Sequence, residues 1–164
     1  MTSLNCISYD YFIQFIRLQM LYVTKKIKFS AAHRLFNPTF TDARNEEIFD
    51  KCNNIMGHGH NYTLEVTVAG IPDPSTGYVI DLKKLKQILQ NEIYEHVDHK
   101  HLNYDVPFLK GIIPSAENIT VTFWNILSEK ISPGKLYRIR LFESDSSWVE
   151  YYGDPIDIPI YELK

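Results

Sequence analysis

Three residues able to bind a metal or to exchange protons lie close together in the segment KCNNIMGHGHNY, residues 51–62: Cys52, His58 and His60. The whole chain holds only two cysteines and six histidines, so this clustering calls for a reason. Thiolate and imidazole are preferred zinc ligands, and both exchange protons near neutral pH. The segment therefore predicts a metal site, a catalytic thiol or both, against the alternative of a loop that is merely rich in these residues.

A third histidine is expected beside this pair. In YVTKKIKFSAAH, residues 22–33, apolar residues alternate and His33 shares their parity, as in a half-buried strand. His58 and His60 are two positions apart and therefore project from one side of the next strand. If the two strands pair, three imidazoles converge at one end of the apolar face.

Three nitrogen ligands that leave one coordination position open are typical of a catalytic zinc site, and the predicted cofactor is Zn²⁺. Gly57 and Gly59 would leave room for the backbone around the metal. Two alternatives stay open. A histidine on an apolar face is usually a hydrogen-bonded core residue, and Cys52 is placed so that it could be a fourth ligand of a closed, structural site.

The elements that would position these residues follow from hydrophobic periodicity, which predicts strands over residues 22–33, 60–70, 135–144 and 147–153. Apolar residues at helical spacing predict one helix over residues 82–97 with Asp81 as its N-cap, and a second over residues 114–131 with Ser115 as its cap. This order predicts an α+β fold: a four-stranded antiparallel sheet with two helices on one face. The long connection 34–57 is expected to be functional or partly helical.

Composition limits the class of protein. The chain has 164 residues, about one domain, and its net charge of −3 without a long run of one sign does not indicate a nucleic-acid or membrane surface. No segment reaches the roughly 18 apolar residues of a membrane span. Two cysteines far apart do not make a disulfide framework, which favours a reducing, cytoplasmic location.

Residues 1–20 differ from the rest and are expected to form an N-terminal arm or extension to a single domain, residues 21–164. The segment lacks a basic start and a small-residue cleavage site, so a secretory signal is not expected. Either it forms a short extra helix or arm, or Met20 is the natural start of translation.

Six motifs in order carry a resemblance to a known family: FSAAHRL, KCNNIMGHGHNY, IDLKKLK, VDHKHLN, PSAEN and LFES. Together, over roughly Leu21 to Gly153, they resemble 6-pyruvoyltetrahydropterin synthase and its bacterial relative 6-carboxytetrahydropterin synthase. The resemblance implies a tunnelling fold, in which the sheets of three subunits close into a twelve-stranded barrel and two trimers stack as a homohexamer. It also implies active sites that lie between subunits.

The resemblance further implies a zinc-dependent lyase acting on a small pterin, 7,8-dihydroneopterin triphosphate. The three histidines would be the zinc ligands, and zinc would lower the barrier to enolisation as a Lewis acid. Cys52 would remove protons from the side-chain carbons as a thiolate, while Asp98 would orient His99 in the proton relay. Without the resemblance, Asp98 and His99 would be read as the end of a helix with a favourable cation.

Glu143 is a candidate for pterin binding. It shares strand parity with Ile139 and Leu141, so its carboxylate faces apolar surroundings and needs a partner. A pterin ring offers an N–H beside an exocyclic amine, and the family anchors the pterin with a glutamate at this place. The alternative is a salt bridge to Arg138 or Arg140, which have the opposite parity.

Ser115 and Glu117 match the pterin-side motif of the family, although Ala116 stands where a threonine is common, so one hydroxyl contact is expected to be missing. The residues that hold the triphosphate are not specified. Several cations flank the motifs and none of them is assigned: Lys28, Arg34, Lys51 and Lys100.

Two enzymes of the family share this site. One leaves a 6-pyruvoyl side chain, and the other releases acetaldehyde, leaves a 6-carboxyl group and leads to queuosine-type deazapurines. The long spacing between Cys52 and His58 resembles the pyruvoyl enzyme of tetrahydrobiopterin biosynthesis more closely. A third hypothesis is a non-catalytic zinc- or pterin-binding protein in which Cys52 is a metal ligand.

Overall fold

The computed structural model describes residues 19–153. Nearly all of the predicted N-terminal arm and the last residues of the predicted domain, 154–164, therefore lie outside the described residues. Among the helices that are described, none has the length and apolar character needed to cross a membrane.

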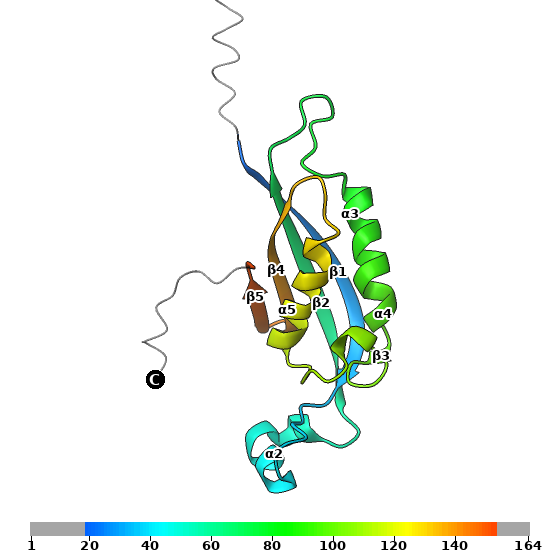
Figure 1. Ribbon diagram of the computed structural model, residues 1–164, viewed down its shortest axis with the longest axis vertical. Coiled ribbons are helices and arrows are strands. Elements are labelled where there is room, and N and C mark those ends of the chain that lie inside the picture. The colour runs from blue at the N-terminus through cyan, green and yellow to red at the C-terminus, as the bar shows by residue number, and fades with distance from the viewer. Residues whose placement is uncertain (1–18, 154–164) are drawn as a thin grey trace, which may run out of the picture.

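A single five-stranded sheet in the order β3-β1-β2-β4-β5 organises the fold (Figure 1). Its long strands are antiparallel neighbours: β1 Leu21–His33, β2 His58–Gly70, β4 Lys135–Ser144 and β5 Ser147–Tyr151. These strands confirm the predicted α+β class and the closing hairpin.

The prediction of four antiparallel strands is wrong in one respect, because a fifth strand, β3 Lys100–His101, pairs in parallel with β1. One further hydrogen bond extends this pairing beyond β3: the Leu102 N–H donates to the Ala32 carbonyl at 2.7 Å. A strand of two residues is too short to show alternation in a sequence, and its partner on the edge of β1 is set only by tertiary contact.

The register of β1 and β2 places His33 opposite His58, and Ala31 opposite His60. The same register sets Phe29 beside Tyr62, and the rings of these two residues stack with their centroids 5.0 Å apart. The predicted pairing of the two histidine-bearing strands is therefore confirmed, and both strands carry their histidines at the same end of the sheet.

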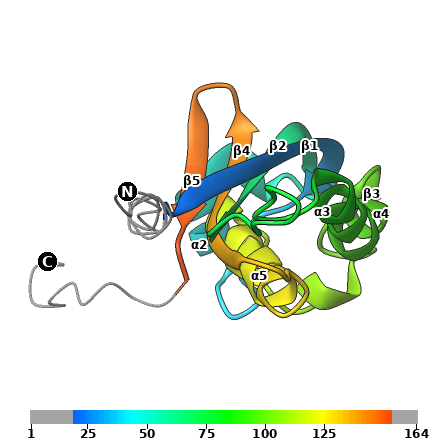
Figure 2. The same ribbon diagram turned by 90° about the horizontal axis from the view of Figure 1, so that it is seen from above.

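All the long helices cover one face of the sheet (Figure 2). The first predicted helix is continuous as α3 Leu82–Leu89, a π-helical turn Gln90–Tyr94 and α4 Glu95–Val97; the second is α5 Ala116–Ser128. The predicted caps are present, since Asp81 accepts a hydrogen bond from the Lys83 N–H and Ser115 accepts one from the Asn118 N–H.

The core lies between the helices and the sheet. Tyr62, Leu64 and Val66 of β2 are fully buried there against helix residues such as Leu85 and Phe123. The opposite face of the sheet carries ion pairs, for example Lys26 with Glu65 at 2.7 Å. The sheet therefore has one apolar side and one charged side, as alternation along its strands requires.

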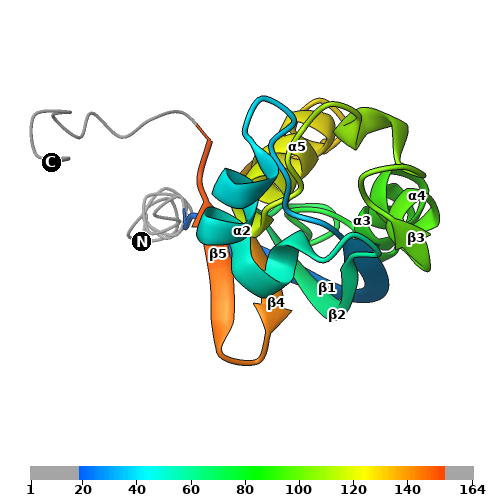
Figure 3. The same ribbon diagram turned by 90° about the horizontal axis from the view of Figure 1, so that it is seen from below.

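The long connection between β1 and β2 is partly helical, as predicted. It contains α2 Asp42–Phe49, which begins at the N-cap Thr41, and a 3₁₀ helix, η1 Asp50–Asn53. Both lie beyond the end of the sheet where β1 stops and β2 starts (Figures 1 and 3). A second 3₁₀ turn, η3 Pro107–Leu109, follows β3.

Replacing Phe123 by alanine should lower the free energy of unfolding by about 3–5 kcal/mol, because this fully buried ring contacts both Phe29 and Phe108. Val121→Ala on the same helix is the control, since Val121 is 39% exposed. Urea unfolding at one fixed protein concentration measures both. Equal losses in the two variants would contradict this packing.

Candidate functional site

The predicted metal ligands meet in space. His33, at the end of β1, and His58 and His60, at the start of β2, place one nitrogen each within 4.8 Å of one another. His33 is buried at 1% exposure, while the other two are half-buried. The cluster is therefore closed toward the core and accessible on its outer side.

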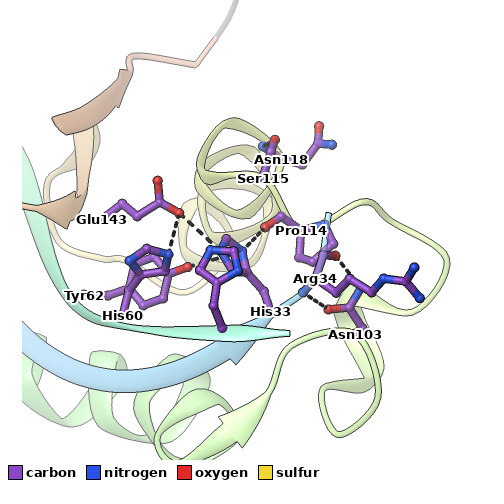
Figure 4. A network of polar contacts seen from close by, with 10 residues as sticks. His33, Arg34, His60, Tyr62, Asn103, Pro114, Ser115, Asn118 and Glu143 are labelled. Carbon is purple, nitrogen blue, oxygen red and sulfur yellow. Dashed lines mark hydrogen bonds and ion pairs between the residues drawn. The ribbon is translucent and has the colours of Figure 1, made fainter. Parts of the chain in front are cut away.

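The orientation of His33 is set by the chain segment that leads into α5. Its Nδ1 donates to the Pro114 carbonyl at 2.7 Å (Figure 4). The lone pair is therefore on Nε2, which lies 3.1 Å from Nε2 of His58. Two unprotonated imidazole nitrogens at this separation repel each other unless a proton or a metal ion lies between them.

The electrostatics favour the neutral, metal-binding form of two of the three histidines. Burial lowers the pKa of His33 and of His58 below the ordinary histidine value, and the neighbouring imidazoles add to this effect. Nε2 of His60 is buried and has no hydrogen-bond partner among the described residues. Two imidazoles favoured in the neutral form, beside a third whose buried Nε2 lacks a hydrogen bond, fit a divalent metal ion.

One of the two predicted glycines is required at this site. Gly57 has a φ of +72°, and a Cβ there would lie 2.7 Å from the His33 carbonyl oxygen and 2.8 Å from Nε2 of His101. At Gly59 a Cβ would be in ordinary contact, 3.6 Å from the Ala31 carbonyl. The backbone at Gly57 therefore needs glycine, whereas Gly59 does not.

Glu143, at the end of β4, reaches the cluster. Its Oε1 is 3.4 Å from Nε2 of His33 and 3.5 Å from Nε2 of His60 (Figure 4). The alternative pairing of Glu143 with arginine is not found among the described residues, in which Arg138 pairs with Glu150, and Arg140 with Glu150 and Glu65. The Glu143 carboxylate therefore borders the candidate metal site.

Tyr62 is a residue at the site that the sequence did not single out. Its hydroxyl lies 3.4 Å from Nδ1 of His33, and the side chain is fully buried. Burial, and next the negative charge of the neighbouring Glu143 carboxylate, raise the pKa of Tyr62 above its ordinary value. Its parity with His58 and His60 in the strand was the available signal.

The residues predicted to bind the pterin line one cavity of about 290 Å³ beside the cluster. Ser115, Glu117 and Glu143 lie in its wall with five others: Leu35, Ala116, Ser147, Trp148 and Val149. The Ser115 hydroxyl is already engaged as the cap of α5, where the Asn118 N–H donates to it at 3.4 Å. The structure thus brings these three predicted residues together next to the histidines.

Cys52 lies in η1, where it is half-buried and, within residues 19–153, forms no disulfide. Its sulfur is not part of the group of converging ligand atoms, which within the described chain consists of the three histidines. This arrangement favours a site with an open position over a closed site in which Cys52 is the fourth ligand.

Asp98 and His99 form the predicted pair on the far side of β1. Oδ2 of Asp98 accepts from Nδ1 of His99 at 2.7 Å, and Oδ1 accepts from the Ser30 N–H at 2.9 Å. Burial by itself raises the pKa of Asp98, but the hydrogen bonds from Ser30, His99 and Tyr94 outweigh it and lower the net pKa. The His99 side chain is 82% exposed.

His99 borders another cavity, of about 440 Å³, which is also lined by residues of β1, β2 and β3 that include Ser30, His60 and His101. No hydrogen bond or ion pair joins His99 to Cys52 within residues 19–153. The structure therefore brings together the metal ligands with Glu143, and Asp98 with His99. His60 and His99 line one cavity, but no hydrogen bond or ion pair within residues 19–153 joins the two groups through Cys52.

Comparison with known proteins decides the family. The sequence model described as 6-pyruvoyl tetrahydropterin synthase matches residues 22–154. The chain belongs to this family. The human 6-pyruvoyl tetrahydrobiopterin synthase is 41% identical over 132 residues, which cover 80% of this chain and 91% of the human protein.

The fold agrees with that of a solved family member. The structure of Caenorhabditis elegans 6-pyruvoyl tetrahydropterin synthase superposes with a TM-score of 0.80 at 37% identity, covering 84% of this chain and 99% of that one. A 6-carboxy-5,6,7,8-tetrahydropterin synthase from Rickettsia bellii is 27% identical over 150 residues. The predicted family is therefore confirmed.

The geometry of the histidine cluster yields a test of metal binding. His58→Ala should weaken Zn²⁺ or Co²⁺ binding by more than about 100-fold, since it removes a direct ligand rather than an outer partner. Cys52→Ala should bind as tightly as the unaltered protein. His96→Ala is the control, because His96 packs on Phe108 away from the cluster.

Equilibrium dialysis against a competing chelator gives the affinities. Loss of metal from the Cys52→Ala variant would overturn the three-histidine assignment. An intense thiolate-to-cobalt charge-transfer band in the unaltered protein would do the same.

Proposed function

We propose that the protein is a zinc-dependent lyase that converts 7,8-dihydroneopterin triphosphate to 6-pyruvoyltetrahydropterin with loss of triphosphate. The observation that carries the proposal is a cluster of three imidazoles that opens beside a cavity bordered by a carboxylate. Membership of the family and relatives named 6-pyruvoyl tetrahydrobiopterin synthase support the substrate and the reaction.

The metal would be held by Nε2 of His33 together with nitrogens of His58 and His60. A bound zinc ion supplies Lewis-acid polarisation of the substrate side-chain hydroxyls, which makes the adjacent carbons easier to deprotonate. The hydrogen bond from His33 Nδ1 to the Pro114 carbonyl fixes the tautomer that such a ligand needs.

The pterin ring would occupy the cavity of about 290 Å³. There Glu143 would accept two hydrogen bonds, from the ring N–H and the exocyclic amine, in the bidentate geometry that suits a carboxylate. Ser115 and Glu117 line the same wall and would contact the ring edge. Since Glu143 borders both the cavity and the histidines, the bound pterin and the metal would be neighbours in one site.

Cys52, Asp98 and His99 would move the protons. Cys52 as a thiolate would take a proton from a side-chain carbon of the substrate. Since His99 uses Nδ1 to donate to Asp98, its Nε2 is free to exchange a proton with Cys52 or with the substrate. Asp98 would keep the imidazole in this tautomer and orientation.

A complete site would need a second copy of the chain, as the family resemblance implies. In agreement with this, no hydrogen bond or ion pair joins Cys52 to His99 within the described residues. We propose sites between the subunits of a homohexamer, a dimer of trimers in which the four antiparallel strands of each of three subunits close a twelve-stranded barrel. Closure would also pair the free edges of the sheet, which a separate sheet leaves exposed. The cytoplasm suits this assignment, because a free Cys52 stays reduced there.

The alternative product is the 6-carboxy compound with release of acetaldehyde, from the same substrate and the same site. The higher identity to pyruvoyl enzymes, 41% against 27%, favours the pyruvoyl product. The third hypothesis, a non-catalytic binding protein with Cys52 as a ligand, is less favoured because Cys52 stands outside the cluster.

Mass spectrometry of the products tests the proposal directly. Zinc-loaded protein incubated with 7,8-dihydroneopterin triphosphate should give a 6-pyruvoyl product and triphosphate without acetaldehyde. Cys52→Ala should abolish turnover while the metal stays bound. A 6-carboxy product with acetaldehyde would support the alternative enzyme, and unchanged substrate would support the binding protein.

Complementation tests the shared site. Cys52→Ala and His99→Ala should each be inactive alone, whereas a co-expressed mixture should recover about one quarter of the activity, because random assembly joins an intact Cys52 to an intact His99 at that frequency. A mixture of Cys52→Ala with His58→Ala is the control. We propose that one copy supplies both residues, so this mixture should recover no activity. No recovery in the first mixture would contradict a site built from two chains.

A further inference from the structure

The backbone around Cys52 is held by the residues that follow the metal ligand His33. The Leu35 N–H donates to the Cys52 carbonyl at 2.9 Å. Nε of Arg34 donates to the Asn53 carbonyl at 2.9 Å and lies 3.2 Å from the Asn53 side-chain oxygen. Nη2 of Arg34 donates to the same side-chain oxygen at 2.8 Å. Hydrogen bonds from Arg34 and Leu35 therefore hold the backbone of Cys52 and Asn53 in place.

Arg34 is itself held in place by two other residues, Asn103 and Phe36. Its N–H donates to Oδ1 of Asn103 at 2.8 Å, and Nδ2 of Asn103 donates to the Arg34 carbonyl at 2.9 Å (Figure 4). Its guanidinium lies over the ring of Phe36, 4.3 Å from the centroid. Both the backbone and the side chain of Arg34 therefore have defined positions.

Asn103 belongs to the segment that carries the second group of proposed catalytic residues. This segment is tied to β1 by the His99 N–H, which donates to the Ser30 carbonyl at 2.6 Å. Arg34 therefore lies where three chain segments meet: the end of β1, which carries the metal ligand His33, the 3₁₀ helix η1, which carries Cys52, and the loop after β3.

We propose that Arg34 is a positioning residue that sets the place of Cys52 relative to the metal ligands through its fork of hydrogen bonds to Asn53. The proposal rests on the function proposed above, in which Cys52 is the base. A base must lie within hydrogen-bond reach of the proton it removes, and an error of about 1 Å costs on the order of 100-fold in rate.

The chemistry of the contact explains why arginine is needed. A guanidinium presents Nε and Nη2 in a rigid plane that meets the carbonyl and the side-chain oxygen of Asn53 together. A lysine ammonium is a point charge on a flexible stem and cannot reproduce this fork. No ion pair to Arg34 is found among residues 19–153, so its role here is geometric rather than neutralisation of an acid.

A competing role for Arg34 is direct binding of the substrate triphosphate. Arg34 lines a cavity of about 320 Å³ with Phe36, Asn103 and Tyr104, where an anion could approach it. The two roles differ in kinetics. Loss of a phosphate contact raises KM, whereas misplacement of the base lowers kcat.

Arg34→Lys and Asn53→Ala are the test variants in the zinc-loaded full chain, with Arg44→Lys as the matched control, since Arg44 in the same connection pairs with Glu47 at 2.7 Å. Arg34→Lys should lower kcat by about 100-fold with KM within about twofold. Asn53→Ala should lower kcat less, because the backbone contact remains. The double variant should have the same kcat as Arg34→Lys alone, because the two substitutions remove the same interaction between Arg34 and Asn53.

Hydrogen–deuterium exchange gives a readout that does not depend on turnover. The peptide over residues 50–57 should exchange faster in Arg34→Lys and Asn53→Ala than in Arg44→Lys, with metal content unchanged. A rise in KM without a fall in kcat, additive losses in the double variant, or unchanged exchange would overturn the positioning role. An unaltered protein that turns over no substrate would instead refute the proposed function, while the exchange result would still decide whether Arg34 holds the Cys52 segment.

Discussion

The pairing register between β1 and β2 is the constraint on which the site depends. Side chains alternate along a strand, so a slip by one residue would send His33 to the charged face of the sheet and away from His58. The register is held by burial of Tyr62, Leu64 and Val66 under the helices, because the same slip would expose all three. The hydrophobic core therefore determines the geometry of the candidate metal site.

The start of α5 connects that core to the histidines. Ser115 caps the helix, and the carbonyl of Pro114 immediately before it fixes the tautomer of His33. Tyr62, beneath the cluster, contacts both His33 and Glu143. One short segment thus begins a helix and orients a ligand, so packing of α5 on the sheet also orients the imidazole.

Most of the fold could be predicted from the sequence, because its strands and helices are long and strongly periodic. The alternation in residues 22–33 predicted both the strand and the direction of His33, and Asp81 and Ser115 predicted where the helices begin. Strand β3 was missed because two residues carry no periodicity and because its partner, β1, is remote in sequence. The contact of Glu143 with two histidines was not foreseen either, since parity gives the side of a strand but not its neighbour across the sheet.

By itself the sequence determined the residue types of the site, the family and the face on which each strand residue projects, because these depend on local order and period. Only the tertiary structure decided which nitrogen of His33 is free, which side chains border the cavity, and that Cys52 stands outside the ligand cluster. These features depend on contacts between segments far apart in the chain, such as the contact of Pro114 with His33 and that of Arg34 with Asn103. Their geometry is set by packing of the whole domain, and no local pattern records it.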